Sequence, residues 1–331
     1  MMEKKAFCGL VTAIFMFTGI CLAHQGEKKT RKFQFELSGG WTEVHKLDLN
    51  HRPKYDEALE EVYLNRYMDK ENQLGDLFNF SWKRDGKFKK IKGCYQINFR
   101  LKYWVTRSLA VSLGLKYTAK KQNSVVTYQY DVESMNPDDV VFYTQYTLER
   151  SYSPYILSAK GYAPMVGLHY ALGRYSNLSF ESYVAVGPFF VSSLLENEIT
   201  HRYEYSHGYW YRQNYVSSLK GKGIGIAFDF GIRMNLKVSN RTGLFLLGGY
   251  TWQKASKISG EYLFEEKLDD LNATGSSQKY SWEGQWILVP ASFDASYKFI
   301  SIVSLYDQED YESFTISLTG VQVRVGLYFA F

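Results

Sequence analysis

The sequence is poor in cysteine, proline and long apolar runs. Its 331 residues include 3 cysteines and 6 prolines, and its mean hydropathy is −0.31. After residue 23, no stretch approaches the roughly 18 apolar residues that a membrane helix needs. These shortages exclude a helical membrane protein. The net charge of +5 is mild and gives no reason to expect a nucleic-acid partner.

The first 23 residues have the pattern of a secretory signal peptide. Lys4 and Lys5 precede an apolar segment, 6–22, and small side chains at Cys21 and Ala23 predict cleavage after Ala23. A lipoprotein anchor at Cys21 is the alternative, but Ile20 does not fit it. We therefore expect Sec-dependent export, a polar periplasmic lead-in over 24–32, and a mature domain over 33–331. Its single cysteine, Cys94, excludes an intramolecular disulfide.

Aromatic residues are abundant instead. They make up 17% of the chain, with 28 Tyr, 22 Phe and 7 Trp. This content is high for a soluble enzyme and typical of β-barrels with aromatic girdles at both membrane interfaces.

The last eleven residues, 321–331, alternate without a break. One face is apolar at every position from Val321 to Phe331, and the other carries Gln322, Arg324 and small residues. Since successive side chains of a strand point to opposite faces, this segment predicts a strand with lipid on one side and a polar lumen on the other.

Seven more segments show the same alternation, and the connections between them follow an order. The predicted strands are 33–42, 93–104, 109–117, 162–172, 178–191, 223–236, 244–252 and 321–331. Long connections (43–92, 119–160, 193–222, 254–313) alternate with short turns. The pattern predicts an all-β, transmembrane, antiparallel up-and-down β-barrel of eight strands, with long extracellular loops and short periplasmic turns.

Three details of this architecture are predicted from local patterns. A hairpin within 286–305 would raise the strand number to ten, which is the alternative. Connection 43–92 has room for one short helix, because its charged stretch from Tyr55 to Met68 has helical spacing. A β-bulge near Thr319-Gly320 would explain why Phe314, Ile316 and Leu318 are out of phase with the final strand.

The final strand, which ends on Phe331, resembles the terminal signal of bacterial outer-membrane barrels. The wider pattern is similar to small barrels of the OmpA, OmpX and PorT kind, especially those of Bacteroidota, as in Val186-Gly187-Pro188-Phe189-Phe190. The resemblance implies a Gram-negative outer-membrane location and recognition by the barrel-assembly machinery. The residues that would carry this signal are Val323, Val325, Leu327, Tyr328, Phe329 and Phe331.

Charged residues occur on the inward-facing positions of the predicted strands. Because an eight-stranded barrel has an interior just filled by side chains, these charges must pair. We expect a salt-bridged interior without an open pore, including a Glu36–Arg324 pair across the closing seam; a narrow ion path is the alternative. The network comprises Glu36, Arg100, Glu181, Asp229, Arg233 and Arg324, with Lys102 and Lys116 nearby.

Two connections have unusual composition. A basic run before residue 93 could neutralise lipopolysaccharide phosphates, or could be a solvated loop base; its residues are Lys83, Arg84, Lys87, Lys89, Lys90 and Lys92. The connection 193–222 is rich in Tyr, with Trp210, Arg202 and Arg212. This composition suits recognition of an extracellular protein or glycan, or a hairpin with Tyr–Tyr pairs around His207-Gly208.

No motif of a known outer-membrane enzyme is present, and His169 is expected to be a packed interior histidine. We therefore expect no catalysis, cofactor or metal. The favoured function is adhesion, surface recognition or envelope structure through the extracellular loops. The alternatives are a barrel enzyme acting on lipid or peptide, and a PorT-like accessory component of a protein export system. Outer-membrane lipid and lipopolysaccharide are the expected surroundings.

Overall fold

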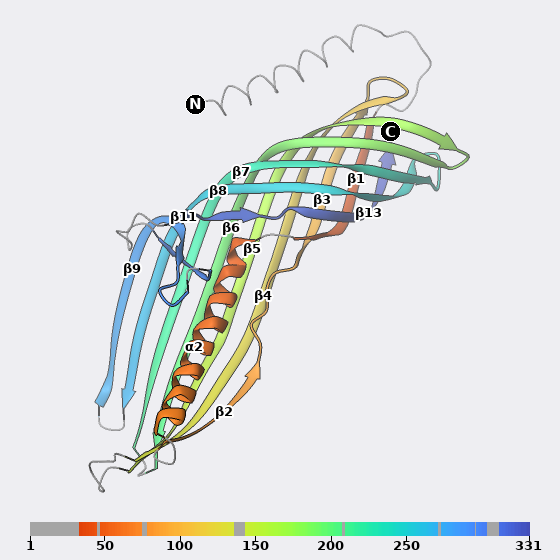
Figure 1. Cartoon of the computed structure of the whole chain (residues 1–331). Coiled ribbons are helices and arrows are strands. Elements are labelled where there is room, and N and C mark those ends of the chain that lie inside the picture. The colour runs from red at the N-terminus through yellow and green to blue at the C-terminus, as the bar shows by residue number, and fades with distance from the viewer. Residues whose placement is uncertain are drawn as a thin grey trace.

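The computed structural model describes residues 33–44, 47–74, 78–135, 143–206, 209–270, 273–294, 296–302 and 311–331. Its main feature is a closed antiparallel ring of eight strands in the order β13-β1-β3-β4-β5-β6-β7-β8, closed by pairing of β8 with β13 (Figure 1). The ring strands are β1 (Phe33–Glu43), β3 (Gly93–Trp104), β4 (Leu109–Met135), β5 (Tyr143–Tyr175), β6 (Leu178–Tyr205), β7 (Trp210–Lys237), β8 (Thr242–Asp270) and β13 (Gly320–Ala330).

The predicted eight-stranded up-and-down barrel is therefore confirmed, and each predicted strand coincides with part of one strand of the ring, except that β13 ends one residue before Phe331. The proposed signal peptide, 1–23, and the lead-in, 24–32, fall outside the described residues.

The barrel wall has an apolar outward face, and most of the inward-facing side chains are polar. On β3, Tyr95, Ile97 and Phe99 point outward and are 46–61% exposed, whereas Gln96 and Asn98 point inward and are at most 6% exposed. This distribution is the reverse of that in a soluble protein, in which apolar side chains are buried. The outer surface is thus an apolar band suited to lipid contact.

Aromatic side chains occur at both ends of this band. Near the turns, Phe33 packs against Tyr103 with ring centroids 4.9 Å apart. At the opposite end, Trp41 packs edge-on against Tyr95 at 4.9 Å, and the ammonium group of Lys120 lies over both rings. Aromatic rings next to a cation are expected at a boundary between lipid and water.

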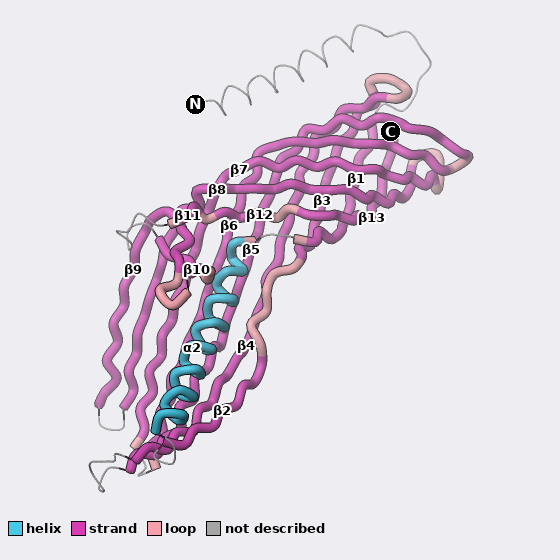
Figure 2. Tube along the Cα trace, in the orientation of Figure 1, coloured by secondary structure: helices cyan, strands magenta, loops and turns pink. Residues whose placement is uncertain are grey.

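Five strands of the ring, β4 to β8, continue far beyond the band and form a curved open wall (Figure 2). We call this wall and the elements packed on it the extension. Its sheet order is β2-β4-β5-β6-β7-β8-β9-β10, and the additional elements are β2 (Phe78–Gly86), β9 (Ala273–Pro290), β10 (Lys298–Ile302), β11 (Glu312–Ser313) and β12 (Thr315–Ser317).

The wall opens because two strands exchange partners as they leave the barrel. Strand β4 pairs with β3 up to Ala119 and with β2 from Val126 onward. Strand β8 pairs with β13 up to Thr251, with β12 over 254–256, and with β9 from Ser259 onward. The alternative ten-stranded barrel is not formed: the predicted extra hairpin exists as β9–β10, but it belongs to the extension.

A long helix, α2 (His51–Leu74), lies on one face of the wall and follows the short 3-10 helix η1 (Asp48–Asn50) (Figure 1). Its 24 residues correct the expectation of a short helix. Asn50 fixes its start, since the side-chain amide exchanges two hydrogen bonds of 2.8 Å with the backbone of Ile91. No helix among the described residues is long and apolar enough to span a membrane.

The expected bulge near Thr319-Gly320 is absent. Ser317 faces Lys254 and Gly320 faces Thr251, so the register between the two strands does not change. The apolar residues instead share the inward face with Gln322 and Arg324, and they are fully buried; they are Phe314, Ile316 and Leu318. The apolar residues move from the outward to the inward positions of the strand because the interior is polar within the barrel and apolar in the extension.

Candidate functional site

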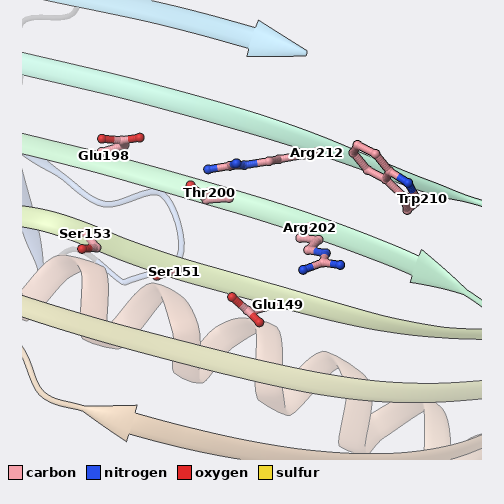
Figure 3. Close-up of a pocket in the computed structure, with 8 residues that line it drawn as sticks. All are labelled: Glu149, Ser151, Ser153, Glu198, Thr200, Arg202, Trp210 and Arg212. Atoms are coloured by element: carbon pink, nitrogen blue, oxygen red, sulfur yellow. The ribbon is translucent and has the colours of Figure 1, made fainter. Parts of the chain in front are cut away.

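A hollow lies on the outward face of the extension, across β5, β6 and β7 (Figure 3). It has a volume of about 470 Å³, within the range of about 300–1,000 Å³ usual for ligand sites. We call it the outer hollow. Its lining residues are Glu149, Ser151, Ser153, Glu198, Thr200, Arg202, Trp210 and Arg212.

Strand register places these side chains in adjacent rows. Arg202 on β6 lies between Glu149 on β5 and Arg212 on β7. In the next row along β6, Thr200 has Ser151 as its neighbour on β5. Successive side chains of a strand point to opposite faces of the wall. Arg150 and His201, which lie between these two rows, point inward, so the side chains of the outer hollow point outward. Three strands therefore present one polar surface.

The two arginines are the most distinctive pair in the outer hollow. Arg202 and Arg212 are direct cross-strand neighbours, and like charges in this position destabilise a sheet. Each has a partner on its own strand: Arg202 Nη2 forms an ion pair with Glu204 Oε2 at 3.4 Å, and Arg212 Nε donates to Asn214 Oδ1 at 3.1 Å. Since 53% of the Arg202 side chain is exposed, its guanidinium can reach a ligand.

Trp210, Glu198 and the hydroxyl groups complete the surface. Figure 3 shows the Trp210 indole at one end and the Glu198 carboxylate toward the other, with both arginines between them. An aromatic face, charged donors and hydroxyl groups on rigid strands are the components of a recognition site. The composition of 193–222 had pointed to Trp210, Arg202 and Arg212, but Glu149, Ser151 and Ser153 come from another connection and could not be assigned from sequence.

The opposite face of the wall is aromatic and is partly covered by α2. Tyr203 and Tyr211 stack with centroids 4.4 Å apart, which confirms the predicted Tyr–Tyr cross-strand pairs of this hairpin. The turn at His207-Gly208 lies outside the described residues. Burial raises the pKa values of both hydroxyl groups, so they remain neutral donors over the physiological range.

Charged groups of α2 are buried against the same face. Glu60 accepts hydrogen bonds from Arg150 at 2.9 Å and Tyr130 at 2.7 Å, and also from the hydroxyl of Tyr152. One turn earlier, Asp56 accepts from the hydroxyl of Tyr155 at 2.8 Å. These two carboxylates anchor the helix and are at most 2% exposed.

The structure brings all the proposed interior charges together in the lumen, where each is at most 8% exposed. Glu36 lies 2.6 Å from Arg233 and 3.1 Å from Lys102, and Lys102 also holds Glu181 at 2.9 Å. The suggested Glu36–Arg324 pair is wrong: the nearest carboxylate to Arg324 is Asp229, at 3.7 Å. Strand shear places Arg324 at a different level from Glu36.

A serine, a histidine and a carboxylate adjoin this network. Ser112 Oγ lies 3.0 Å from His169 Nε2, and His169 Nδ1 lies 3.7 Å from Glu181. Ser112 and His169 are at most 3% exposed. Only the contact between Ser112 and His169 is a hydrogen bond, because the separation between His169 and Glu181 is too long for one. No group of three or more potential metal ligands occurs in the part of the chain that the structure describes.

The basic run is divided between two places. The carbonyl oxygen of Lys92 accepts a hydrogen bond of 2.9 Å from the backbone N–H of Val44. Since Val44 is three residues beyond Trp41, Lys92 lies next to the band. Lys83 is far along the extension, opposite Gln129. Arg84 has a partner within the chain, Glu57 at 3.1 Å. The remaining members, Lys87, Lys89 and Lys90, lie on the connection between β2 and β3.

The proposed assembly signal forms the closing seam. Val323, Val325, Leu327 and Phe329 face outward, while Tyr328 faces inward beneath Arg233. Phe331 exchanges two backbone hydrogen bonds with Phe33, at 3.0 and 3.3 Å.

Comparisons with known proteins give little beyond this geometry. No family model and no curated protein matches the chain. Among solved structures, a bacterial polysaccharide outer membrane secretin is 7% identical, with 92% of this chain and 100% of that chain covered and a TM-score of 0.15. OmpT, an outer membrane protein of Vibrio cholerae in its trimer form, is 8% identical, with 77% and 100% covered and a TM-score of 0.09. These scores are too low to support an argument, and the chain's own structure defines it as an eight-stranded barrel of the transmembrane type.

Proposed function

We propose that the chain is a non-catalytic integral outer-membrane barrel whose extension is displayed outside the cell and recognises a glycan in the outer hollow. The barrel supplies the anchor, because its apolar band has aromatic rings at both ends. The short turns belong on the periplasmic side and the extension on the extracellular side, as in other barrels of this architecture.

The observation that carries the glycan proposal is the side-by-side placement of Arg202 and Arg212 next to Trp210. An acidic sugar offers a carboxylate to the guanidinium groups and an apolar ring face to the indole. Ser151 and Thr200 can bond its hydroxyl groups. Because strands continuous with the barrel hold these side chains, little ordering is needed on binding.

The part of the basic run that follows β2 supports a contact with the membrane surface. We propose that Lys92, close to the band, neutralises phosphates of lipopolysaccharide together with Lys89 and Lys90 on the same connection. Lys83 and Arg84 lie on β2, which pairs with β4 in the extension. The Bacteroidota origin and recognition of the seam by the barrel-assembly machinery are parts of the same proposal.

Binding of purified protein in detergent to arrays of acidic and neutral oligosaccharides tests the recognition site. We expect selective binding of acidic glycans, and a loss of about tenfold or more in affinity for Arg202→Gln/Arg212→Gln and for Trp210→Ala. Arg66→Gln, an exposed change on α2, is the control for loss of charge. Equal binding by the hollow variants and the control would refute the assignment.

Location is tested separately in cells. The boiled and unboiled protein should migrate differently on a gel, and trypsin added to intact cells should cleave the extension. Protein that is found soluble in the periplasm would contradict the membrane location without bearing on the glycan assay.

A further inference from the structure

The lumen of the barrel contains more positive than negative charge. Within the described residues of the ring, its buried cations are Arg100, Lys102, Lys116, Arg233 and Arg324, and its buried carboxylates are Glu36, Glu181 and Asp229. Five basic side chains thus face three acids. An uncompensated charge is costly in a closed interior surrounded by lipid.

The geometry identifies which cations are left over. Three of the cations approach the carboxylates closely: Lys102 lies 2.9 Å from Glu181, Lys116 lies 2.8 Å from Asp229, and Arg233 lies 2.6 Å from Glu36. The other two are more distant from their nearest acids. Arg100 is 3.9 Å from Glu36, and Arg324 is 3.7 Å from Asp229.

These two guanidinium groups pack on the same side chain. Arg100 and Arg324 lie 5.2 and 5.4 Å from the centre of the Tyr183 ring. The Tyr183 hydroxyl accepts hydrogen bonds from Gln322 Nε2 at 2.9 Å and from Arg324, so its own proton is available to a further acceptor.

Further donors in this region lack acceptors. The Nε of Arg324 and the Nδ2 of Asn98 are buried without a hydrogen-bond partner among the described residues. Asn98 is on the inward face of β3, one inward position from Arg100. A buried donor without an acceptor costs free energy, and here the donors accompany an excess of positive charge.

We propose that the lumen holds a halide-sized inorganic anion, such as chloride, at the two arginines Arg100 and Arg324 beside Tyr183. The anion accepts from donors that the protein leaves unpaired and halves the excess charge. Because the surrounding side chains are almost fully buried, it becomes enclosed as the barrel folds. This ion is a structural ligand, independent of the outer hollow.

Refolding in defined anions tests the proposal. Full-length mature protein is refolded from urea into detergent in chloride, bromide or gluconate at equal ionic strength, since gluconate is too large to be enclosed. The unfolding midpoint, read from heat-modifiable gel mobility, should be about 5 °C higher in chloride or bromide and should saturate with concentration. Equal midpoints in all three salts would overturn the proposal.

A variant and a direct readout locate the ion. Arg324→Gln removes one excess charge and should lose most of the chloride dependence, whereas Lys254→Gln, an exposed change, should retain it. If Arg324→Gln does not fold, Arg100→Gln serves the same purpose. Crystals of the unaltered protein grown in bromide should show an anomalous peak beside Tyr183, and a featureless lumen there would refute the site.

Discussion

The carboxylate of Glu60 on α2 lies 2.9 Å from the guanidinium of Arg150 on β5, and both side chains are buried. The planar ring of Tyr63, one turn further along the helix, lies 4.2 Å from the same guanidinium. The helix is therefore attached to the wall by a buried ion pair and its hydrogen bonds as well as by apolar packing.

Glu60→Gln should detach α2 from the wall. The change keeps the shape of the side chain but leaves Arg150 buried without a compensating charge, which typically costs about 3–5 kcal/mol. Hydrogen exchange of the folded protein should show loss of protection over 51–74, with the barrel unchanged. Glu61→Gln, at the neighbouring exposed position, is the matched control, and equal protection in the two variants would contradict the role of Glu60.

The extension should become less stable in acid because of His201. Burial, followed by the charge of Arg150, lowers the pKa of His201 from 6.5 to about 4. A folded-state pKa below the unfolded value means that the neutral form stabilises the fold: this stability is present above about pH 6.5 and is lost as the pH falls toward 4. Protease susceptibility of the extension should therefore rise between pH 7.5 and 5.

His201→Gln provides the comparison, since it cannot acquire a proton in this range. The increase in susceptibility between the two pH values should be smaller in the variant than in the unaltered chain. An identical increase would assign the acid effect to other groups.

Two single methyl additions should have opposite outcomes in the barrel. At Gly225, a Cβ atom would lie 1.8 Å from the backbone oxygen of Lys254, so Gly225→Ala forces β7 and β8 apart. At Gly248, on the outward face, a Cβ atom would meet nothing within 4 Å. We expect the heat-modifiable form to be much reduced for Gly225→Ala and unchanged for Gly248→Ala; similar yields would show that the ring adjusts.

Deletion of Phe331 should impair assembly more than stability. The deletion removes two backbone hydrogen bonds to Phe33, whereas the pairs from Gln34–Ala330 to Thr42–Gln322 remain. We expect little assembled protein in cells, but a nearly normal unfolding midpoint after refolding in detergent. Leu244→Ala, a lipid-facing change on β8, should assemble normally. An equal loss in both settings would indicate a purely structural role.

The sequence predicted the barrel well because lipid and lumen impose opposite demands on alternate residues. On β3, this contrast fixed both ends of the strand, Gly93 and Trp104. The extension was less predictable, since its apolar residues, such as Tyr130 and Phe314, face inward and its polar residues face water. The length of α2 was underestimated because its buried face carries Asp56 and Glu60, so it lacks an apolar stripe.

The outer hollow could be predicted only in part, for a different reason. Trp210, Arg202 and Arg212 belong to one hairpin, and their composition was noticeable. Glu149 becomes their neighbour only through the pairing of β5 with β6, and two irregularities shift this register. A shift of one residue would have turned Glu149 to the opposite face of the wall.

The continuity of β5, β6 and β7 from the outer hollow into the barrel has a mechanical consequence. If the chain has the proposed function, a ligand pulled away from the cell would load each of these strands along its own axis, and the covalent backbone would carry the tension directly into the membrane. No row of hydrogen bonds has to be peeled open one by one, and no flexible hinge is stretched first. With the proposed function, the chain would act as a tether that stays stiff under tension.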